Sequence, residues 1–514
     1  MLWTQLVPQR IRDWLANPLI YLVILAALLR LPFIGQKSLN MDEWWGVIQS
    51  KPGLTYIFKE EWKIDIHPPL NFVFLHYWTK LSQADWFLRL PFSLFGILCV
   101  VAIYRLGTDL FGRRVGLLAA LIMAVSPYAI FYSNYAKCYS LIVLLTILSL
   151  WMVWCGCWQN RFGYWIGVAA LNTLGLYFHY AMGLVIAAQI AFLIATRSWR
   201  STRWTWLVGA YAGTLLLFIP WMPIFLDQMR SQRDVALASP LARGLPIPFK
   251  LMYFFFSLSL GESVQPYNYL VVVPAAIVFG VAFLMGTVAL LRAKERGYLI
   301  LMALWVPIIV LILRPSFIVK HVNIAYPAFV LTIVMGLYAF PNLRVSQVFT
   351  LAVCLLSLYS VSNYHQNIQL HDSTMAVPWR QVAQNISNTA GASDAVLVFP
   401  ENELFRYYYT GKAPLYTLSL DATQEQIAAT LRRLERKKIW VLLVYSGAEH
   451  EQKRSWIRKM LKSYWTVQRQ EKFAPDESLL AGLKAGKLRA FRYYALEVYR
   501  CFPKRHLSKG ESPK

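Results

Sequence analysis

Charged side chains are scarce in this sequence of 514 residues, of which only 15% are charged and 57% are hydrophobic. A soluble domain usually carries about 25% charged residues, so a soluble multidomain enzyme is disfavoured. Disorder is excluded, because disordered chains are poor in aromatic residues and these make up 15% here. A membrane helix needs about 20 apolar residues, so about ten spans would use roughly 200 to 250 positions. The composition predicts a polytopic membrane protein with a soluble part.

Acidic residues are few: 26 Asp and Glu stand against 51 Lys and Arg, for a net charge of +25. The excess fits basic loops on the cytoplasmic side and attraction to anionic membrane lipids. It also fits an anionic substrate such as a lipid phosphate, and the two interpretations are compatible. Nucleic acid is disfavoured as a partner, because no soluble segment interleaves basic residues with stacking aromatic residues.

The sequence has neither a cysteine framework nor a metal-binding pattern. Its six cysteines include one Cys-x-Cys, at Cys155 and Cys157, but no Cys/His pairs at the spacing of a metal site. We interpret the cysteines as packing thiols and expect no cofactor, with a single divalent ion shared by Asp42 and a substrate phosphate left open. No small-residue cleavage site follows Arg10 and Arg12, so the first apolar run is expected to be an uncleaved anchor.

The apolar runs predict a polytopic α-helical membrane protein with about 11 spans, and at most about 13. Two further segments, 70–82 and 249–261, are too short to cross and are expected to lie along the membrane interface. The predicted spans are residues 18–35, 88–110, 115–133, 139–157, 163–179, 181–196, 204–225, 269–291, 298–313, 322–340 and 346–363.

The basic turns between these spans indicate their orientation. All of them fall on one side of the membrane only if segment 70–82 does not cross it. They hold Arg113 and Arg114, Arg161, residues 197–203, residues 292–296, and Arg344. Because basic loops stay in the cytoplasm, the N-terminus is expected inside and the loop 36–69 outside. An odd number of spans then places the C-terminus outside, in an integral protein of the plasma (inner) membrane.

The composition changes at residue 364, which predicts a transmembrane domain over 1–363 and an extracytoplasmic domain over 364–514. The second domain alternates short apolar strands with helices, as in a small α/β domain. The expected strands are 394–399, 439–445 and 466–473, and the expected helices are 423–437 and 451–465. The segment has no Gly-rich phosphate loop and no paired carboxylates. We therefore interpret it as a scaffold or as the part that recognises an acceptor.

Carboxylates beside a membrane span are candidates for function. Placing a charged side chain there is unfavourable in free energy unless the side chain faces water or a partner. Asp42 and Glu43 closely follow the first span, where a solvated helix cap is the alternative interpretation. The same loop ends in Asp65, His67 and the prolines 68–69, which fix the backbone and start the interfacial helix. This arrangement aims Asp65 and His67 at the water boundary, where both are candidates for the site.

Several short motifs follow one another in a fixed order. They are Asp42-Glu43, His67-Pro68-Pro69-Leu70, the stretches 88–96 and 110–114, the loop 126–140, residues 176–180, Trp379-Arg380 and Asp394. Each motif is weak alone, but the series resembles the protein O-mannosyltransferase-like glycosyltransferases of the GT-C superfamily, which also contains the lipid A aminoarabinose transferases. The resemblance implies a GT-C-like catalytic domain over residues 1–363.

The resemblance also implies an activity: transfer of a hexose or pentose from a polyprenyl-phosphate donor to a hydroxyl of a protein, glycan or lipid on the outer face of the membrane. Asp42 would be the general base that deprotonates this hydroxyl, and Glu43 its neighbour. Because phosphate is a good leaving group, cations can replace a general acid. The candidates for substrate binding are Asp65, His67, Tyr135, Lys137, His179, Arg314, Lys320 and His321. Arg314 is preferred among the cations, since a guanidinium binds phosphate bidentately.

One position departs from the family. Where a Gln-Glu-Ala-Arg pattern is common in the second outer loop, this sequence has Asn134-Tyr135-Ala136-Lys137. Tyr135 thus replaces an acid and Lys137 replaces an arginine. Three interpretations follow: Tyr135 donates a hydrogen bond in place of the carboxylate, the acceptor is unusual, or the protein is inactive.

Two other functions compete with glycosyl transfer. One is transport of a lipid or solute, and the other is a noncatalytic scaffold for assembly of the cell envelope. Transporters tend to carry internal repeats with Gly or Pro interruptions in corresponding halves, and we find no such duplication. The scaffold is favoured only by the replacement at Tyr135.

Overall fold

The computed structural model describes residues 17–200, 202–238, 246–266, 268–314, 319–368, 377–446, 451–473 and 494–504. The chain divides into two compact units, which are described separately. The larger unit comprises Met1–Gln36 and Trp45–His365, and the smaller unit comprises Lys37–Trp44 and Gln366–Lys514.

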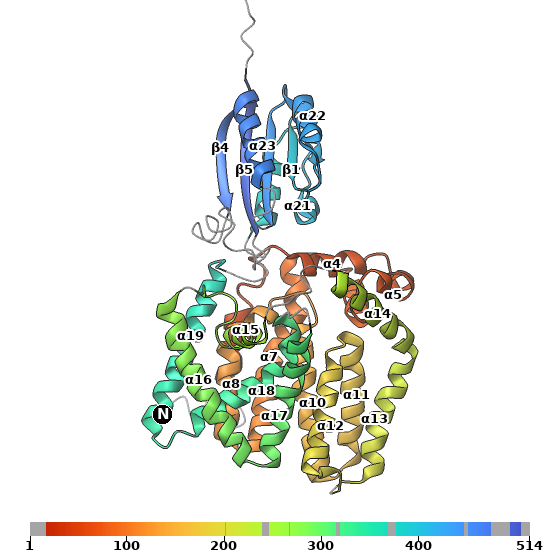
Figure 1. The fold of residues 1–514 in the computed structure, drawn as a ribbon, viewed down its shortest axis with the longest axis vertical. Helices are drawn as coiled ribbons and strands as arrows, with labels where there is room; N and C mark the ends of the chain where they lie inside the picture. Colours follow the sequence, from red (N-terminus) through yellow and green to blue (C-terminus); the bar gives the residue numbers. More distant parts are fainter. Residues whose placement is uncertain are drawn as a thin grey trace, which may run out of the picture. The chain divides into compact units, whose positions relative to one another are not determined.

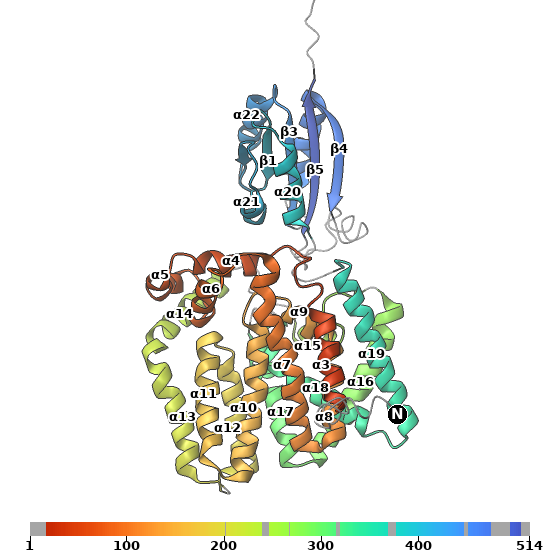
Figure 2. The ribbon, with the colours of Figure 1, turned by 180° about the vertical axis from the view of Figure 1, so that it is seen from behind.

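The larger unit has a helix at every position where an apolar run predicted a span. These helices are α3 (Pro18–Arg30), α7 (Asp85–Phe111), α8 (Arg113–Val125), α9 (Pro127–Ser133), α10 (Tyr139–Gln159), α11 (Phe162–Phe178), α12 (Met182–Thr196), α13 (Trp204–Phe218), α16 (Tyr269–Arg292), α17 (Glu295–Leu313), α18 (Tyr326–Tyr338) and α19 (Leu343–His365). Figures 1 and 2 both show α10, α11, α12 and α13 side by side.

Among the described residues, seven helices are long and apolar enough to cross a membrane, or eight if α8 and α9 form one span bent by 61°. The bend lies at Ser126, whose side chain caps α9, and at Pro127, which begins it. The shorter apolar helices, of 10 to 17 residues, include α3, α11 and α12. The prediction of a multi-pass membrane protein is confirmed, and the count of about 11 spans stays a prediction.

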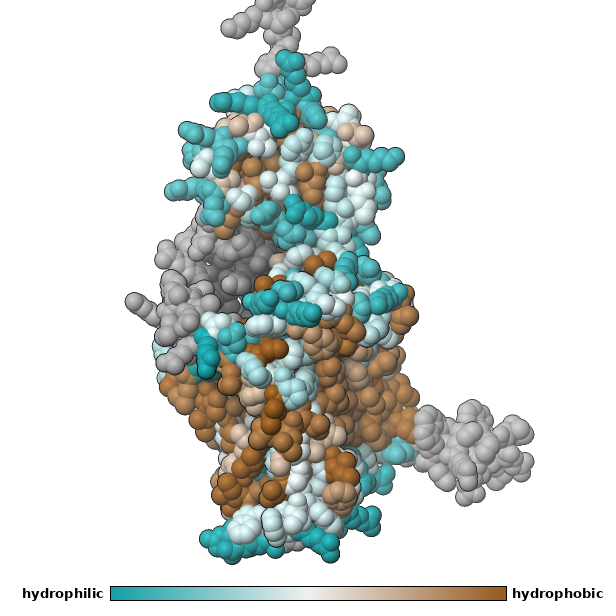
Figure 3. All heavy atoms as spheres, turned by 90° about the vertical axis from the view of Figure 1, so that its right-hand side faces the viewer, coloured by the Kyte–Doolittle hydropathy of each residue, from teal (hydrophilic) through white to brown (hydrophobic). Residues whose placement is uncertain are grey.

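The surface of the larger unit is that of a protein surrounded by lipid. Large apolar side chains point outward from its helices; Leu270 is 90% exposed, and Leu284 and Leu313 are each 68% exposed. Figure 3 shows apolar side chains over much of the visible face of this unit and hydrophilic ones at its end. Apolar surface of this extent belongs in a bilayer.

Glycines bring some of these helices into close contact. A Cβ at Gly286 of α16 would lie 1.8 Å from the backbone oxygen of Thr332 in α18, and a Cβ at Gly336 would lie 1.8 Å from the oxygen of Ala282. Such small residues allow helix backbones to approach inside a membrane, where apolar burial alone drives little association.

The predicted outer loop 36–69 is largely helical. It contains α4 (Met41–Ser50), α5 (Leu54–Lys59) and the 3₁₀-helix η1 (Glu61–Lys63). The two segments predicted at the interface form α6 (Leu70–Trp78) and α15 (Ile247–Leu260), and further short helices are α14 (Met222–Ala238) and η5 (Val319–Ala325). The helices of the outer loop have no long apolar run, so hydropathy alone did not indicate them.

The smaller unit contains a five-stranded sheet in the order β2-β1-β3-β5-β4. Its strands are β1 (Ala395–Phe399), β2 (Leu415–Thr417), β3 (Ile439–Ser446), β4 (Trp465–Phe473) and β5 (Tyr494–Pro503). β1 pairs in parallel with β2 and β3, whereas β5 is antiparallel to β3 and β4. The α/β domain that the sequence predicted is therefore present, with β2 and β5 as strands that it did not predict.

Helices cover both faces of this sheet. They are α20 (Trp379–Thr389), α21 (Glu403–Tyr408), α22 (Gln424–Leu434) and α23 (Glu451–Tyr464). On one face, Leu397 of β1 belongs to a core with Ile427 of α22 and Ile457 of α23. Figure 1 shows α23 in front of the sheet, and Figure 2, from behind, shows α20 in front of it.

Candidate functional site

The first turn of α4 carries Asp42 and Glu43 and belongs to the smaller unit. The backbone N–H of Glu43 donates to the Asn40 side chain at 2.8 Å, and the Glu43 carboxylate accepts from the Asn40 N–H at 2.9 Å. This reciprocal pair is a capping box, which satisfies the free N–H groups at a helix start. Glu43 is fully buried in this cap, whereas Asp42 is half-buried. The structure therefore gives Glu43 a structural task and leaves Asp42 as the stronger candidate for a base.

In the larger unit, a compact turn joins Asp65 to His67. One Asp65 oxygen accepts from the His67 backbone N–H at 2.9 Å and contacts the His67 Nδ1, and the other accepts from the Trp45 indole at 2.8 Å. Burial alone would raise the pKa of Asp65, but the charge and hydrogen bonds of His67, with the charge of Lys137, hold this pKa well below its usual range. Asp65 is therefore an ionised carboxylate that orients His67.

A glutamine that sequence analysis did not identify holds this turn in place. The Gln228 amide of α14 donates to the carbonyl of Asp65 at 2.7 Å and to that of Trp62 at 3.1 Å. Its oxygen accepts from the Tyr180 hydroxyl at 2.5 Å, which in turn accepts from the Trp221 indole at 2.8 Å. Each member of this buried network has its partners, so the turn is fixed from several helices.

Three predicted histidines lie in a row. The ring centroids of His67 and His179 are 5.7 Å apart, and those of His179 and His321 are 5.9 Å apart. The His179 Nδ1 accepts from the Ala181 N–H at 3.1 Å, so the proton of the neutral ring lies on Nε2. That Nε2 is buried and has no hydrogen-bond partner among the described residues. A donor without a protein acceptor is available to an anionic ligand.

The second outer loop contributes Tyr135 and Lys137, just after α9. Lys137 is only 3% exposed, and its charge acts on Asp65, His179 and His321. Tyr135 is buried and packs edge-on against Tyr139 at 5.4 Å, and Tyr139 lies 6.3 Å from His179. The second outer loop is therefore close to the histidine row.

The remaining predicted cations follow α17. Arg314 is exposed, and its backbone carbonyl accepts from the Lys250 ammonium at 2.7 Å. Lys320 is half-buried in η5 beside His321, and both cations act electrostatically on that histidine. We name Asp65, His67, Lys137, His179, Lys320 and His321 the polar cluster. The structure brings these predicted residues together, with Tyr135 and Arg314 at its edge.

A further carboxyl, Glu61, joins the polar cluster without having been predicted. It is 1% exposed, and its Oε1 has no hydrogen-bond partner among the described residues. Burial, reinforced by the charge of Asp65, raises the pKa of Glu61 to about 9 despite the opposing charge of Lys137. In the sequence, Glu61 lies between charged residues of a polar loop, and no signal there indicates its burial.

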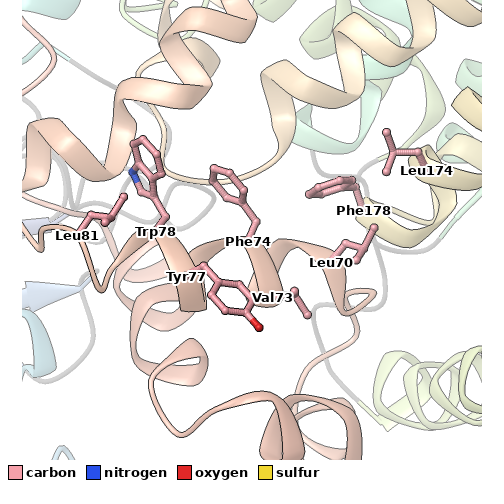
Figure 4. A pocket seen from close by; sticks show the side chains of 8 residues that line it. All are labelled: Leu70, Val73, Phe74, Tyr77, Trp78, Leu81, Leu174 and Phe178. Atoms are coloured by element: carbon pink, nitrogen blue, oxygen red, sulfur yellow. The ribbon is translucent and has the colours of Figure 1, made fainter.

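The larger unit has an apolar groove of about 340 Å³. Figure 4 shows its lining, which comes from α6, Leu81 and α11: Leu70, Val73, Phe74, Tyr77, Trp78, Leu81, Leu174 and Phe178. Along the chain, Leu70 lies three positions after His67, and Phe178 immediately precedes His179. Each wall of the groove therefore holds a residue that is close in the sequence to a histidine of the row. Among the described residues, no three His, Cys, Asp or Glu side chains are arranged to hold a metal ion.

We compared the chain with known protein families, curated proteins and solved structures. The family model described as dolichyl-phosphate-mannose-protein mannosyltransferase matches residues 66–224. No curated protein matches the chain. The matched segment contains four of the predicted site residues: His67, Tyr135, Lys137 and His179.

Solved structures match over nearly the whole chain. ArnT from Cupriavidus metallidurans in the apo state is 10% identical, with a TM-score of 0.57 over 95% of this chain and 98% of that one. The same protein bound to undecaprenyl phosphate matches with a TM-score of 0.52 at 11% identity, over 96% and 99% of the two chains. The archaeal oligosaccharyltransferase AglB from Archaeoglobus fulgidus, in complex with an inhibitory peptide and a dolichol-phosphate, matches with a TM-score of 0.50 at 10% identity, over 90% and 73%. These are GT-C glycosyltransferases, so the predicted GT-C-like fold is confirmed.

Proposed function

We propose that this chain, whose fold is that of the GT-C glycosyltransferases, is a membrane enzyme that transfers a sugar from a polyprenyl-phosphate donor to an acceptor hydroxyl. The transfer takes place on the outer face of the membrane, and the acceptor is a protein, a glycan or a lipid. Solved relatives of the same fold that carry undecaprenyl phosphate or dolichol-phosphate support this class of donor.

The observation that carries the proposal is the polar cluster itself. Lys137 and Lys320 supply positive charge, and His179 supplies an N–H that has no acceptor among the described residues. A lipid phosphate needs charge-assisted hydrogen bonds of this kind, which are about twice as strong as neutral ones. The same groups would stabilise the negative charge that develops on the phosphate as it leaves.

The apolar groove supports a lipid-linked substrate. An isoprenoid chain gains about 0.8 kcal/mol for each buried CH₂ group. In a membrane protein, that chain stays in an apolar environment while its phosphate is held at the polar boundary. We assign the isoprenoid chain to the groove between α6 and α11, whose walls include Leu70 and Phe178, close in the sequence to His67 and His179.

The chemical step needs one base and no general acid. The acceptor oxygen attacks the anomeric carbon and forms the new C–O bond, while the bond from that carbon to the phosphate oxygen breaks and its electron pair leaves with the phosphate. We assign the proton of the acceptor to the carboxylate of Asp42, with Glu43 holding the helix that carries it. Tyr135 takes the position of the family's second-loop acid as a hydrogen-bond donor.

Consumption of the donor tests this function. Membranes that contain the protein are incubated with polyprenyl-phosphate sugars whose sugar is radiolabelled, and the label left in the lipid donor is measured. Lys137→Ala should lower kcat/KM for the donor roughly 10- to 100-fold, because a buried charge-assisted hydrogen bond is lost. Arg344→Ala, in the exposed first turn of α19, serves as the control and should be unchanged. A transporter or a scaffold would leave the donor intact, and that result would refute the proposal.

A further inference from the structure

Glu61 is a buried carboxyl that the proposed chemistry does not use. It begins η1, and its backbone carbonyl accepts from the N–H groups of Ile64 and Asp65, both at 3.0 Å. The side chain is 1% exposed, yet its Oε1 has no hydrogen-bond partner among the described residues. A buried polar atom without a partner destabilises a fold unless something outside the protein satisfies it.

Among the described residues, two polar neighbours of Glu61 direct their hydrogen bonds to other groups. The two oxygens of Asp65 are taken by Trp45 and His67. Tyr180, which interacts electrostatically with Glu61, donates its hydroxyl proton to Gln228. The Glu61 carboxyl therefore has an oxygen that a ligand can reach without displacing a protein partner among the described residues.

We infer that Glu61 binds a hydroxyl group of the sugar carried by the lipid donor. The inference rests on the proposed function and adds to it the residue that distinguishes a sugar-bearing lipid phosphate from the bare lipid phosphate. Glu61 then acts in recognition of the substrate, beside the groups that hold the phosphate.

The charges around Glu61 favour a neutral hydroxyl over the other candidates. The titratable groups that act on it or that it acts on are Asp65 from its own loop, Lys137 from the second outer loop, and Tyr180 after α11. Because the pKa of Glu61 is about 9, the group is a protonated carboxylic acid at neutral pH. Such a group donates one hydrogen bond and accepts others, as a sugar hydroxyl does. A phosphate would instead be drawn to Lys137 and the histidines.

The test compares binding of a bare lipid phosphate and of sugar-bearing lipid phosphates to the purified full-length protein. The probes are bare undecaprenyl phosphate and a set of sugar-bearing forms, namely undecaprenyl-phosphate mannose, undecaprenyl-phosphate glucose and decaprenyl-phosphate arabinose. Glu61→Ala should weaken binding of the sugar-bearing form that the wild type prefers by about 3- to 10-fold, as expected for one neutral hydrogen bond. Binding of the bare phosphate should not change. Glu60→Ala is the matched control, because Glu60 is the preceding residue and its carboxylate is exposed in a pair with Lys63.

A second measurement separates binding from a structural role. Above pH 4.5 the unfolded Glu61 ionises, whereas the folded one stays protonated up to about pH 9, so the wild type loses stability across this range. Glu61→Gln removes that loss and should melt at a higher temperature than the wild type at pH 8, with the difference vanishing towards pH 4.5. In activity assays, kcat/KM of the wild type for the donor should fall as the pH rises through about 9, and Glu61→Gln should remove that fall.

The outcomes are distinguishable from failure of the proposed function. If Glu61→Ala weakens both lipids equally, or if Glu61→Gln melts below the wild type at pH 8, Glu61 is structural and the inference is wrong. The inference also fails if the wild type binds every sugar-bearing lipid no better than the bare phosphate, although the phosphate site then stands. Failure to bind any of these lipids would refute the proposed function together with the inference.

Discussion

Asp42 and Glu43 are neighbours in the sequence, but their carboxyl groups have different surroundings. Glu43 is fully buried and accepts from the Asn40 N–H in the cap of α4. Its carboxylate is therefore engaged in holding the start of the helix. Asp42, in the same turn, is half-buried. The role of general base is therefore proposed for Asp42.

Asp42→Asn should lower the rate of sugar transfer by at least about 100-fold, since general bases typically contribute roughly 10²- to 10⁴-fold. Glu43→Gln should lower it less, because an amide oxygen can still accept from the Asn40 N–H. The measurement is the initial rate of donor consumption, normalised to the amount of folded protein in the membrane. Full turnover by Asp42→Asn would show that the base lies elsewhere.

Asp65→Asn should lower the melting temperature at neutral pH, because one of the two oxygens that serve Trp45 and His67 is lost. Loss of a buried hydrogen bond of this kind costs roughly 1–3 kcal/mol. Since the folded pKa of Asp65 lies below its ordinary value of 3.8, its contribution is complete above that pH and is lost as the pH falls through the folded pKa.

The difference in melting temperature between the wild type and Asp65→Asn should therefore be constant from about pH 5 to pH 8 and should shrink in acid. Glu60→Gln, which alters only an exposed pair, should show little difference at any pH. A difference that grows as the pH falls would contradict the assigned ionised state of Asp65.

At the scale of single residues, Asp65 and His67 could be predicted as site residues from their place in the loop between a membrane span and an interfacial helix. Glu61 and Gln228 could not be predicted in this way. The hydrogen bond from Gln228 to Asp65 joins residues 163 positions apart. Nothing in the local pattern around either residue indicates that pairing. Burial of Glu61 likewise depends on segments that are distant in the sequence, so both residues needed the three-dimensional structure.

At the scale of elements, close packing of α16 against α18 gives a sharp contrast between two glycines of one helix. A Cβ at Gly286 would lie 1.8 Å from the Thr332 oxygen, whereas a Cβ at Gly280 would meet no atom within 4 Å. Gly286→Ala should therefore force the helices apart and cost at least about 1–3 kcal/mol, the usual penalty of overpacking. Gly280→Ala should be neutral or slightly stabilising, since alanine favours a helix. The yield of monodisperse protein and its melting temperature measure both effects, and equal behaviour of the two variants would contradict this packing.

Long apolar runs were the elements most readily predicted, because hydropathy over about 20 residues identifies a membrane helix without tertiary information. Short elements were harder to predict from the sequence. β2 has only three residues, from Leu415 to Thr417, and β5 is defined by its pairing with β3 and β4. α4 and η1 lie in a loop rich in charge and Trp, where no apolar period marks a helix. These elements depend on caps and partners, which hydropathy does not describe.

At the scale of the whole molecule, the orientation in the membrane is the prediction on which the site depends. The loop 36–69 and residues 364–514 are expected outside, because this arrangement gathers the basic turns in the cytoplasm. Single cysteines in place of Lys59 and Ser419, which are both exposed, should react with an impermeant thiol reagent in intact cells. A cysteine in place of the exposed Arg113, in a predicted inner turn, should react only after permeabilisation. Protection of the first two positions would overturn the orientation.

The central claim is that a sugar leaves a lipid phosphate at the polar cluster, with the bond between the anomeric carbon and the phosphate oxygen as the one that breaks. A donor labelled with one isotope in the sugar and another in the isoprenoid chain tests this claim most directly. Membranes with the wild-type protein should release one bare polyprenyl phosphate for each sugar transferred, and membranes with Lys137→Ala should release far less of both. An intact donor, or free polyprenol in place of polyprenyl phosphate, would contradict the account.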